Sequence, residues 1–92
     1  MGAKLMGKLR SFDIWERKNA ETLIRFRCFE DLSTGRFCVQ NADFYRMPVT
    51  DQYLMQLERQ FIELLTEEDP FSRSGSFISI AEAIKDHEAS FE

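Results

Sequence analysis

Few side chains in this chain have the types and spacing that catalysis or metal binding requires. The one histidine, His87, lies in a segment expected to be helical, where its neighbours Asp86 and Glu88 do not share its face. Cys28 and Cys38 are ten residues apart, whereas a zinc site needs clustered cysteine and histidine ligands. The four glycines are isolated, so the chain has no glycine-rich phosphate loop. We therefore predict no enzymatic activity, no metal and no other cofactor.

The cysteines also bear on the core and the compartment. Cys28 is expected to pack in the core as a small hydrophobic residue, whereas Cys38 lies nearer the end of its strand. A disulfide between them would need a strand register shifted by two residues from the preferred one, and it stays an open alternative. No secretory segment is recognisable at the start, and no stretch approaches the roughly 20 apolar residues that span a bilayer. We expect a cytoplasmic protein that does not enter membranes.

The most distinctive chemistry is a set of aromatic and basic side chains at alternate positions of the predicted strands. Alternate residues of a strand point to the same side, so these side chains would gather on one face of the sheet. Trp, Tyr, Phe and Arg are the residue types enriched where proteins bind one another. The residues that we predict to bind a partner are Trp15, Arg25, Arg27, Phe29, Phe37 and Tyr45.

Three interpretations of this face compete. It binds a polypeptide, either a different protein or a second copy; it stacks the bases of single-stranded nucleic acid; or a C-terminal helix covers it as core. Nucleic-acid binding is disfavoured by the net charge of −4 and by Asp13 and Asp43, which lie on the same face. The charge is also uneven, because residues 1–47 carry nine basic and six acidic side chains and residues 48–92 carry three and ten. Such a dipolar chain suits an anionic partner or contact between copies.

The elements that would carry this face form a β-meander. Alternating apolar and polar side chains are typical of half-buried strands. A three-residue turn closed by Gly35 would join the second and third strands, and it predicts Arg25 opposite Asp43 and Phe29 opposite Val39. The predicted strands are residues 9–16, 22–30 and 36–44.

A long amphipathic helix is predicted after the strands. Thr50 is a good N-cap, and the helix would run over residues 51–68, before Pro70. Its apolar stripe is expected to cover the face of the sheet that holds Ile24 and Phe26. Because one helical layer covers only one face, the aromatic and basic face would then stay open.

A short helix is predicted near the C-terminus. Ser79 and Glu82 form a capping box, and the helix would end near Glu88, after a loop at residues 71–77. The fold class is therefore α+β: a three-stranded antiparallel β-meander followed by a long amphipathic helix and a short C-terminal helix. The chain is expected to be a single domain, residues 1–92, with residues 1–8 as a flexible N-terminus. We predict a small protein-interaction or regulatory domain that binds a protein partner or forms a homodimer, with single-stranded nucleic-acid binding as the alternative.

Overall fold

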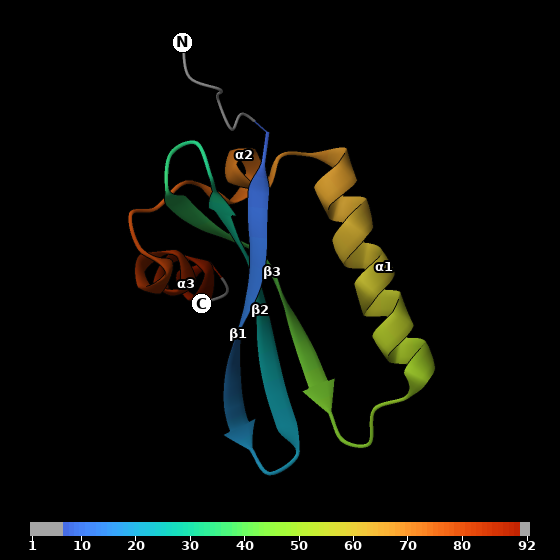
Figure 1. The fold of residues 1–92 in the computed structure, drawn as a ribbon. Helices are drawn as coiled ribbons and strands as arrows, with labels where there is room; N and C mark the ends of the chain where they lie inside the picture. Colours follow the sequence, from blue (N-terminus) through green and yellow to red (C-terminus); the bar gives the residue numbers. More distant parts are fainter. Residues whose placement is uncertain (1–6, 91–92) are drawn as a thin grey trace.

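The computed structural model describes residues 7–90 and confirms the predicted α+β class (Figure 1). Three strands form an antiparallel meander in the order β1-β2-β3: β1 (Leu9–Asn19), β2 (Thr22–Asp31) and β3 (Arg36–Arg46). Three helices follow: α1 (Asp51–Glu67), α2 (Pro70–Ser74) and α3 (Ile80–Ala89). The first six residues of the segment expected to be flexible lie outside the described residues.

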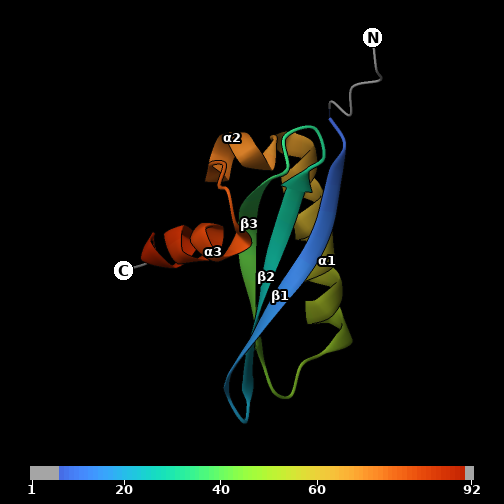
Figure 2. The same cartoon turned by 60° about the vertical axis from the view of Figure 1, so that its left-hand side comes forward.

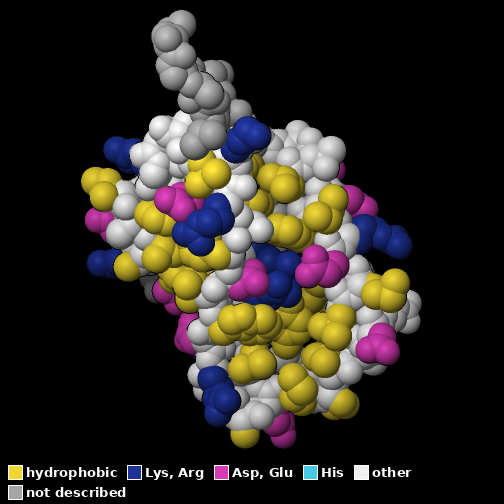
Figure 3. Space-filling view, viewed as in Figure 1, with side chains coloured by type: hydrophobic (Ala, Val, Ile, Leu, Met, Phe, Trp, Pro, Cys, Tyr) yellow, Lys and Arg dark blue, Asp and Glu magenta, His cyan; other side chains and the backbone are white. Residues whose placement is uncertain are grey.

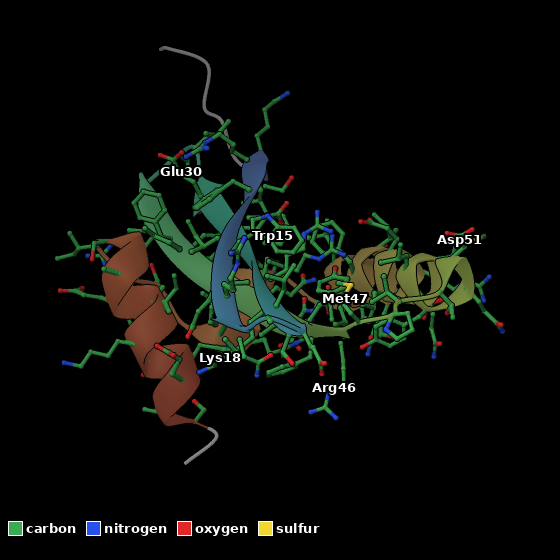
Figure 4. All side chains as sticks on the ribbon, turned by 90° about the horizontal axis from the view of Figure 1, so that it is seen from below. Trp15, Lys18, Glu30, Arg46, Met47 and Asp51 are labelled. Atoms are coloured by element: carbon green, nitrogen blue, oxygen red, sulfur yellow. The ribbon has the colours of Figure 1, made fainter. Side chains whose placement is uncertain are left out.

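The helices cover both faces of the sheet, so the fold has three layers (Figure 4). α3 packs on the face that holds Ile24, Phe26 and Cys28, here called the α3 face. α1 packs on the opposite face, here called the α1 face, where Phe61 stacks on Phe29 with ring centroids 5.7 Å apart. Figure 2 shows α3 on the β3 side of the sheet, with β1 as the strand farthest from it.

The prediction that the long helix covers the face with Ile24 and Phe26 is therefore wrong. Both faces of the sheet are apolar enough to take a helix, so the apolar stripe of α1 does not choose between them. The charges do, because Glu58 of α1 accepts a hydrogen bond from the buried guanidinium of Arg27 at 3.0 Å. A guanidinium buried under an apolar helix without a carboxylate partner would carry a large desolvation cost. α1 avoids this cost for Arg27 because it brings Glu58 to the same face.

The register of β2 and β3 matches the prediction over one half and departs from it over the other. Arg25 lies opposite Asp43, as predicted. A β-bulge then inserts an extra residue in β3, so that Phe29 lies opposite Cys38 and not Val39. Because side chains alternate along a strand, the β3 residues before Gln40 lie on the opposite face from the one predicted.

The bulge moves one of the predicted binding residues to the other face. Phe37 lies on the α3 face, where its ring meets Phe12 edge-on at 6.1 Å. Its backbone also exchanges two hydrogen bonds of 2.9 Å with Phe77, in the segment that leads to α3. The residue left without a partner at the bulge is Gln40, whose Nε2 donates to the backbone oxygen of Phe61 at 3.2 Å.

The helix caps follow the sequence signals closely. Thr50 Oγ1 accepts the N–H of Tyr53 at 3.1 Å, and Ser79 Oγ accepts the N–H of Glu82 at 3.2 Å, as predicted. The loop predicted at residues 71–77 instead contains the short helix α2. It begins with Pro70 at the first helical position, after an Asp69 cap that accepts from Phe71 N. Within residues 7–90, no helix has the length and apolarity to cross a bilayer.

The two cysteines are free and fully buried, on opposite faces of the sheet. Cys28 is in the core under α3, whereas Cys38 lies opposite Phe29 and therefore on the α1 face. Burial raises the pKa of each thiol to about 12. Side chains on opposite faces cannot form a disulfide without moving the backbone, so the structure excludes the alternative left open by the sequence.

Candidate docking groove between β1 and α1

A line of five charged side chains crosses the α1 face between β1 and α1. Arg25 Nη2 donates to Asp13 Oδ2 at 2.7 Å, and its Nη1 lies 3.6 Å from Glu58 Oε1. Arg27 donates from Nη1 to the same Glu58 oxygen at 3.0 Å and from Nε to Asp43 Oδ2 at 2.8 Å. Acidic and basic groups thus alternate along the line, and it begins and ends with an acid.

Both arginines stay charged in this setting. The hydrogen bond to Asp13 is the main cause that raises the pKa of Arg25 above its ordinary value. Burial acts to lower the pKa of Arg27, but the hydrogen bonds to Asp43 and Glu58 outweigh it and the pKa is raised. Each guanidinium therefore has carboxylate partners within the chain, and the line offers no uncompensated positive charge.

An open hollow of about 660 Å³, lined by both apolar and polar side chains, lies at one end of the charged line, between the start of β1 and the end of α1. Its apolar lining includes Leu9 from β1, Phe29 from β2, and Phe61, Ile62 and Leu65 from α1. Ile62 is 54% exposed although it faces the hollow. Figure 3 shows apolar surface on both sides of the charged cluster, between β1 and α1.

An aromatic cluster lies at the other end of the charged line. Trp15 projects from β1 on the side of α1 and is 52% exposed (Figure 4). Its ring lies 5.6 Å from Tyr45, which in turn meets Tyr53 edge-on at 6.4 Å. The guanidinium carbon of Arg25 lies 5.2 Å from the Trp15 ring centroid, which is a cation–π distance. Trp15 is therefore held in place from below while its outer side faces solvent.

The outer edge of β3 is protected at three points. Phe77 pairs with Phe37 at its start, the bulge at Gln40 interrupts its middle, and the hydroxyl of Tyr53 donates to the backbone oxygen of Phe44 at 2.7 Å. Bulges, covering segments and occupied backbone groups are the devices by which proteins prevent unwanted pairing at a sheet edge.

The outer edge of β1 has no such protection from Leu9 to Arg17; a register irregularity in this strand lies farther on, between Arg17 and Asn19. β1 is eleven residues long, contains no proline, and pairs only with β2. Leu32 N donates to Lys8 O, so Lys8 and Leu32 are a hydrogen-bonded pair of the antiparallel ladder. Such pairs alternate, so every second residue of β1 directs both its N–H and its C=O away from β2. These outward groups belong to Leu9, Ser11, Asp13 and Trp15.

Between Leu9 and Trp15, the charged side chains of β1 do not extend over this edge. Arg10 is turned towards β2, where its Nε donates to Glu30 at 2.8 Å, and Asp13 is turned towards Arg25. Both side chains are thus engaged with residues of β2 and do not cover the outward backbone groups of the edge. The free edge of β1, the hollow and Trp15 are contiguous, and together they are called the groove from here on.

The structure brings five of the six predicted binding residues to one face but leaves only Trp15 exposed. Arg27, Phe29 and Tyr45 are buried under α1, and Arg25 is largely buried beside Asp13. Phe37 is on the other face, as described above. The expectation of a broad open aromatic and basic face is therefore corrected to a narrow groove beside a covering helix.

Sequence reasoning missed the helical wall of the groove. Phe61, Ile62 and Leu65 of α1 line the hollow, and Ile62 stays 54% exposed. The sequence signal for this wall was the width of the apolar stripe of α1. Because Phe61 and Ile62 are adjacent, they point in different directions around the helix, and the sheet cannot cover both. Leu9 was likewise treated as the first residue of a strand and not as part of a binding surface.

No protein-family model, curated protein or solved structure matches this chain. Among residues 7–90, no three His, Cys, Asp or Glu side chains are grouped in a way that would hold a metal ion. Within residues 7–90, the groove is the surface feature that points most directly to a function.

Proposed function

We propose that this chain is a non-enzymatic protein-interaction domain that receives an extended polypeptide along the free edge of β1. The incoming strand would pair with the outward groups of β1, and alternate side chains would enter the groove towards α1. The observation that carries the proposal is the contrast between the two sheet edges. The β3 edge is closed at three points, whereas the β1 edge is open from Leu9 to Trp15.

Trp15 is the residue that we expect to anchor the partner. Tryptophan is the residue type most enriched among those that dominate binding energy, and its rigid ring loses little entropy when it is covered. Arg25 and Tyr45 already fix the ring from below. A partner that covers the exposed half would therefore gain apolar contact without having to order the side chain.

The same geometry favours a polypeptide over single-stranded nucleic acid. Phosphate binding needs basic groups with free charge, but Arg25 and Arg27 have Asp13, Asp43 and Glu58 as partners. The charged line holds three carboxylates and two guanidinium groups, so its net negative charge would repel a phosphate backbone. Free thiols suit a reducing compartment such as the cytoplasm, so we propose a cytoplasmic protein as the partner.

A matched pair of variants at Ser11 tests the proposal. Ser11 is exposed and its N–H is one of the outward groups, so Ser11→Pro removes an edge donor without breaking a bond to β2. Ser11→Ala keeps that N–H and is the control. Random linear peptides displayed on phage would be selected on the Ser11→Ala protein. Self-association of each variant would be measured by light scattering.

We expect the Ser11→Pro protein to bind the selected peptides, or to self-associate, at least about tenfold more weakly than the Ser11→Ala protein. Trp15 is the only tryptophan, so its fluorescence emission reports whether the ligand covers the groove. Ligands that bind both variants equally would contradict the proposal. So would a Ser11→Ala protein that neither selects peptides nor associates with itself.

A further inference from the structure

We infer that the polypeptide received by β1 is the β1 strand of a second copy of this chain, paired antiparallel about a twofold axis at Phe12. The inference rests on the proposed function, because it names the partner of the same edge. Two meanders would then join into one continuous sheet, and the contact would be isologous, with each groove filled by the other copy.

On the α1 face, this pairing matches apolar with apolar and polar with polar side chains. Leu9 lies opposite the partner's Trp15, and Ser11 lies opposite the partner's Asp13. The second pair matches a hydroxyl with a carboxylate that accepts hydrogen bonds. All four residues carry outward groups, so the backbones exchange N–H···O bonds at each of these positions.

On the α3 face, the same pairing is also complementary. Phe12 lies opposite the partner's Phe12. This is a pair with no backbone hydrogen bonds between the two copies, and in such pairs the side chains approach most closely. Lys8 lies opposite the partner's Glu16, which is an opposite-charge pair. The stem of Arg10 lies beside the partner's Ile14, while its guanidinium stays over the Phe12 ring of its own chain, 4.6 Å from the centroid.

Neighbouring registers are less favourable. A pairing centred on Ser11 places Leu9 opposite the partner's Asp13 and leaves Lys8 and Arg10 opposite apolar residues.

The next registers in the other direction oppose like charges. A pairing centred on Asp13 places that carboxylate opposite the partner's Asp13. A pairing centred on Ile14 places Arg10 opposite the partner's Lys18. Like charges directly opposite one another destabilise a strand pair, and the pairing centred on Phe12 instead combines an apolar pair, Leu9 with Trp15, and an opposite-charge pair, Lys8 with Glu16.

The groove is incomplete without the second copy. In the pairing centred on Phe12, the partner's Trp15 lies beside Leu9, at the mouth of the 660 Å³ hollow lined by Phe61, Ile62 and Leu65. That hollow is open to solvent, and its apolar wall lies beside the polar side chains of Ser11, Asp31 and Asp69. Trp15 is a large and half-exposed ring. Each chain therefore offers both the ring and its receptor, and this reciprocity is what a symmetric dimer requires.

Two measurements on the full chain test the inference. The wild-type protein is expected to have a mass of twice 10.9 kDa in solution, with Trp15→Ser shifting the dissociation constant by on the order of 30-fold. Ile78→Ser is the matched control, because Ile78 is 72% exposed and lies outside β1, and it should leave the dimer intact.

The second measurement reads the register by disulfide formation. Ser11→Cys and Asp13→Cys proteins are prepared separately, mixed and mildly oxidised. The pairing centred on Phe12 predicts a crosslink in the mixture, at directly opposite positions, and little in either variant alone. The native cysteines do not interfere, since both are fully buried.

The outcomes separate the two levels of the proposal. A wild-type chain that stays at 10.9 kDa at every concentration, while selected peptides still distinguish Ser11→Pro from Ser11→Ala, overturns the second copy but leaves the docking edge standing. A crosslink in Ser11→Cys alone, or in Asp13→Cys alone, overturns the register centred on Phe12. Loss of the dimer in Ile78→Ser and not in Trp15→Ser overturns the assigned interface.

Discussion

Arg27 and Asp43 form an ion pair at 2.8 Å beneath α1, and each side chain is only 3% exposed. Asn41 donates to the second oxygen of Asp43 at 2.9 Å, and Glu58 supplies a second carboxylate to Arg27. The pair joins β2 to β3 and draws α1 onto the same face. Arg27 therefore holds the fold together and is not available to a partner.

The first prediction is that Arg27→Met destabilises the protein strongly. The substitution keeps most of the side-chain volume but leaves Asp43 buried without its counter-charge, which typically costs about 3–5 kcal/mol of unfolding free energy. Urea denaturation followed by circular dichroism measures this loss. Arg25→Met is the control, because Arg25 and Asp13 are partly exposed and their pair should contribute less. Equal effects of the two substitutions would contradict the structural role of Arg27.

A second prediction concerns thiol reactivity. Burial raises the pKa of Cys28 and of Cys38 to about 12, and neither sulfur is exposed. Only thiolates react readily with disulfide reagents, so the folded protein is expected to show no fast-reacting thiol at pH 8, and both thiols should react after denaturation. Rapid labelling of Cys38 in the folded protein would show that the end of the sheet near α2 opens.

The third prediction is that stability falls as the pH drops below about 6.5, the ordinary pKa of histidine. Burial lowers the pKa of His87 in the folded protein, although Asp86 and Glu88 partly oppose this. Below about 6.5 the unfolded chain therefore binds more protons than the folded chain, and the unfolding free energy decreases. His87→Phe keeps a ring near Phe26 and should flatten the profile between pH 7 and the onset of carboxylate titration. An unchanged profile in that variant would assign the effect to other groups.

A fourth prediction separates the proposed partner from nucleic acid. Titration of the protein with single-stranded oligonucleotides is expected to give no saturable binding at about 200 mM salt, because the two central arginines are neutralised within the chain. Fluorescence of Trp15 would report stacking of a base. Tight binding that weakens steeply between about 50 and 200 mM salt would instead support the alternative derived from the sequence.

The elements of the fold were predictable because their signals are local. Alternating side chains marked the three strands, and the caps at Thr50 and Ser79 fixed the starts of two helices. The Asp69-Pro70 pair that begins α2 was also a local signal, but the predicted loop overlooked it. In contrast, the choice of sheet face by α1 depends on the contact of Glu58 with Arg27, and residues 31 positions apart carry no local pattern.

The binding site was only partly predictable, for two physical reasons. First, the bulge at Gln40 exchanges the faces of the residues before it in β3, so Phe37 was assigned to the wrong face. Second, the alternation of side chains along a strand predicts which of them share a face, but it does not predict whether a helix covers that face. Phe29 and Trp15 are both aromatic residues on the α1 face, yet α1 buries Phe29 and leaves Trp15 half-exposed.

Amide hydrogen exchange along β1 tests the docking edge most directly. When the protein concentration is raised over the range in which copies associate, or when a selected peptide is added, the outward amides of β1 should exchange more slowly. The intervening amides of Arg10, Phe12 and Ile14 are already bonded to β2 and should not change. This alternation with a period of two residues is the result that we predict. Uniform behaviour along the strand, or outward amides that exchange at the same rate under all these conditions, would contradict the account.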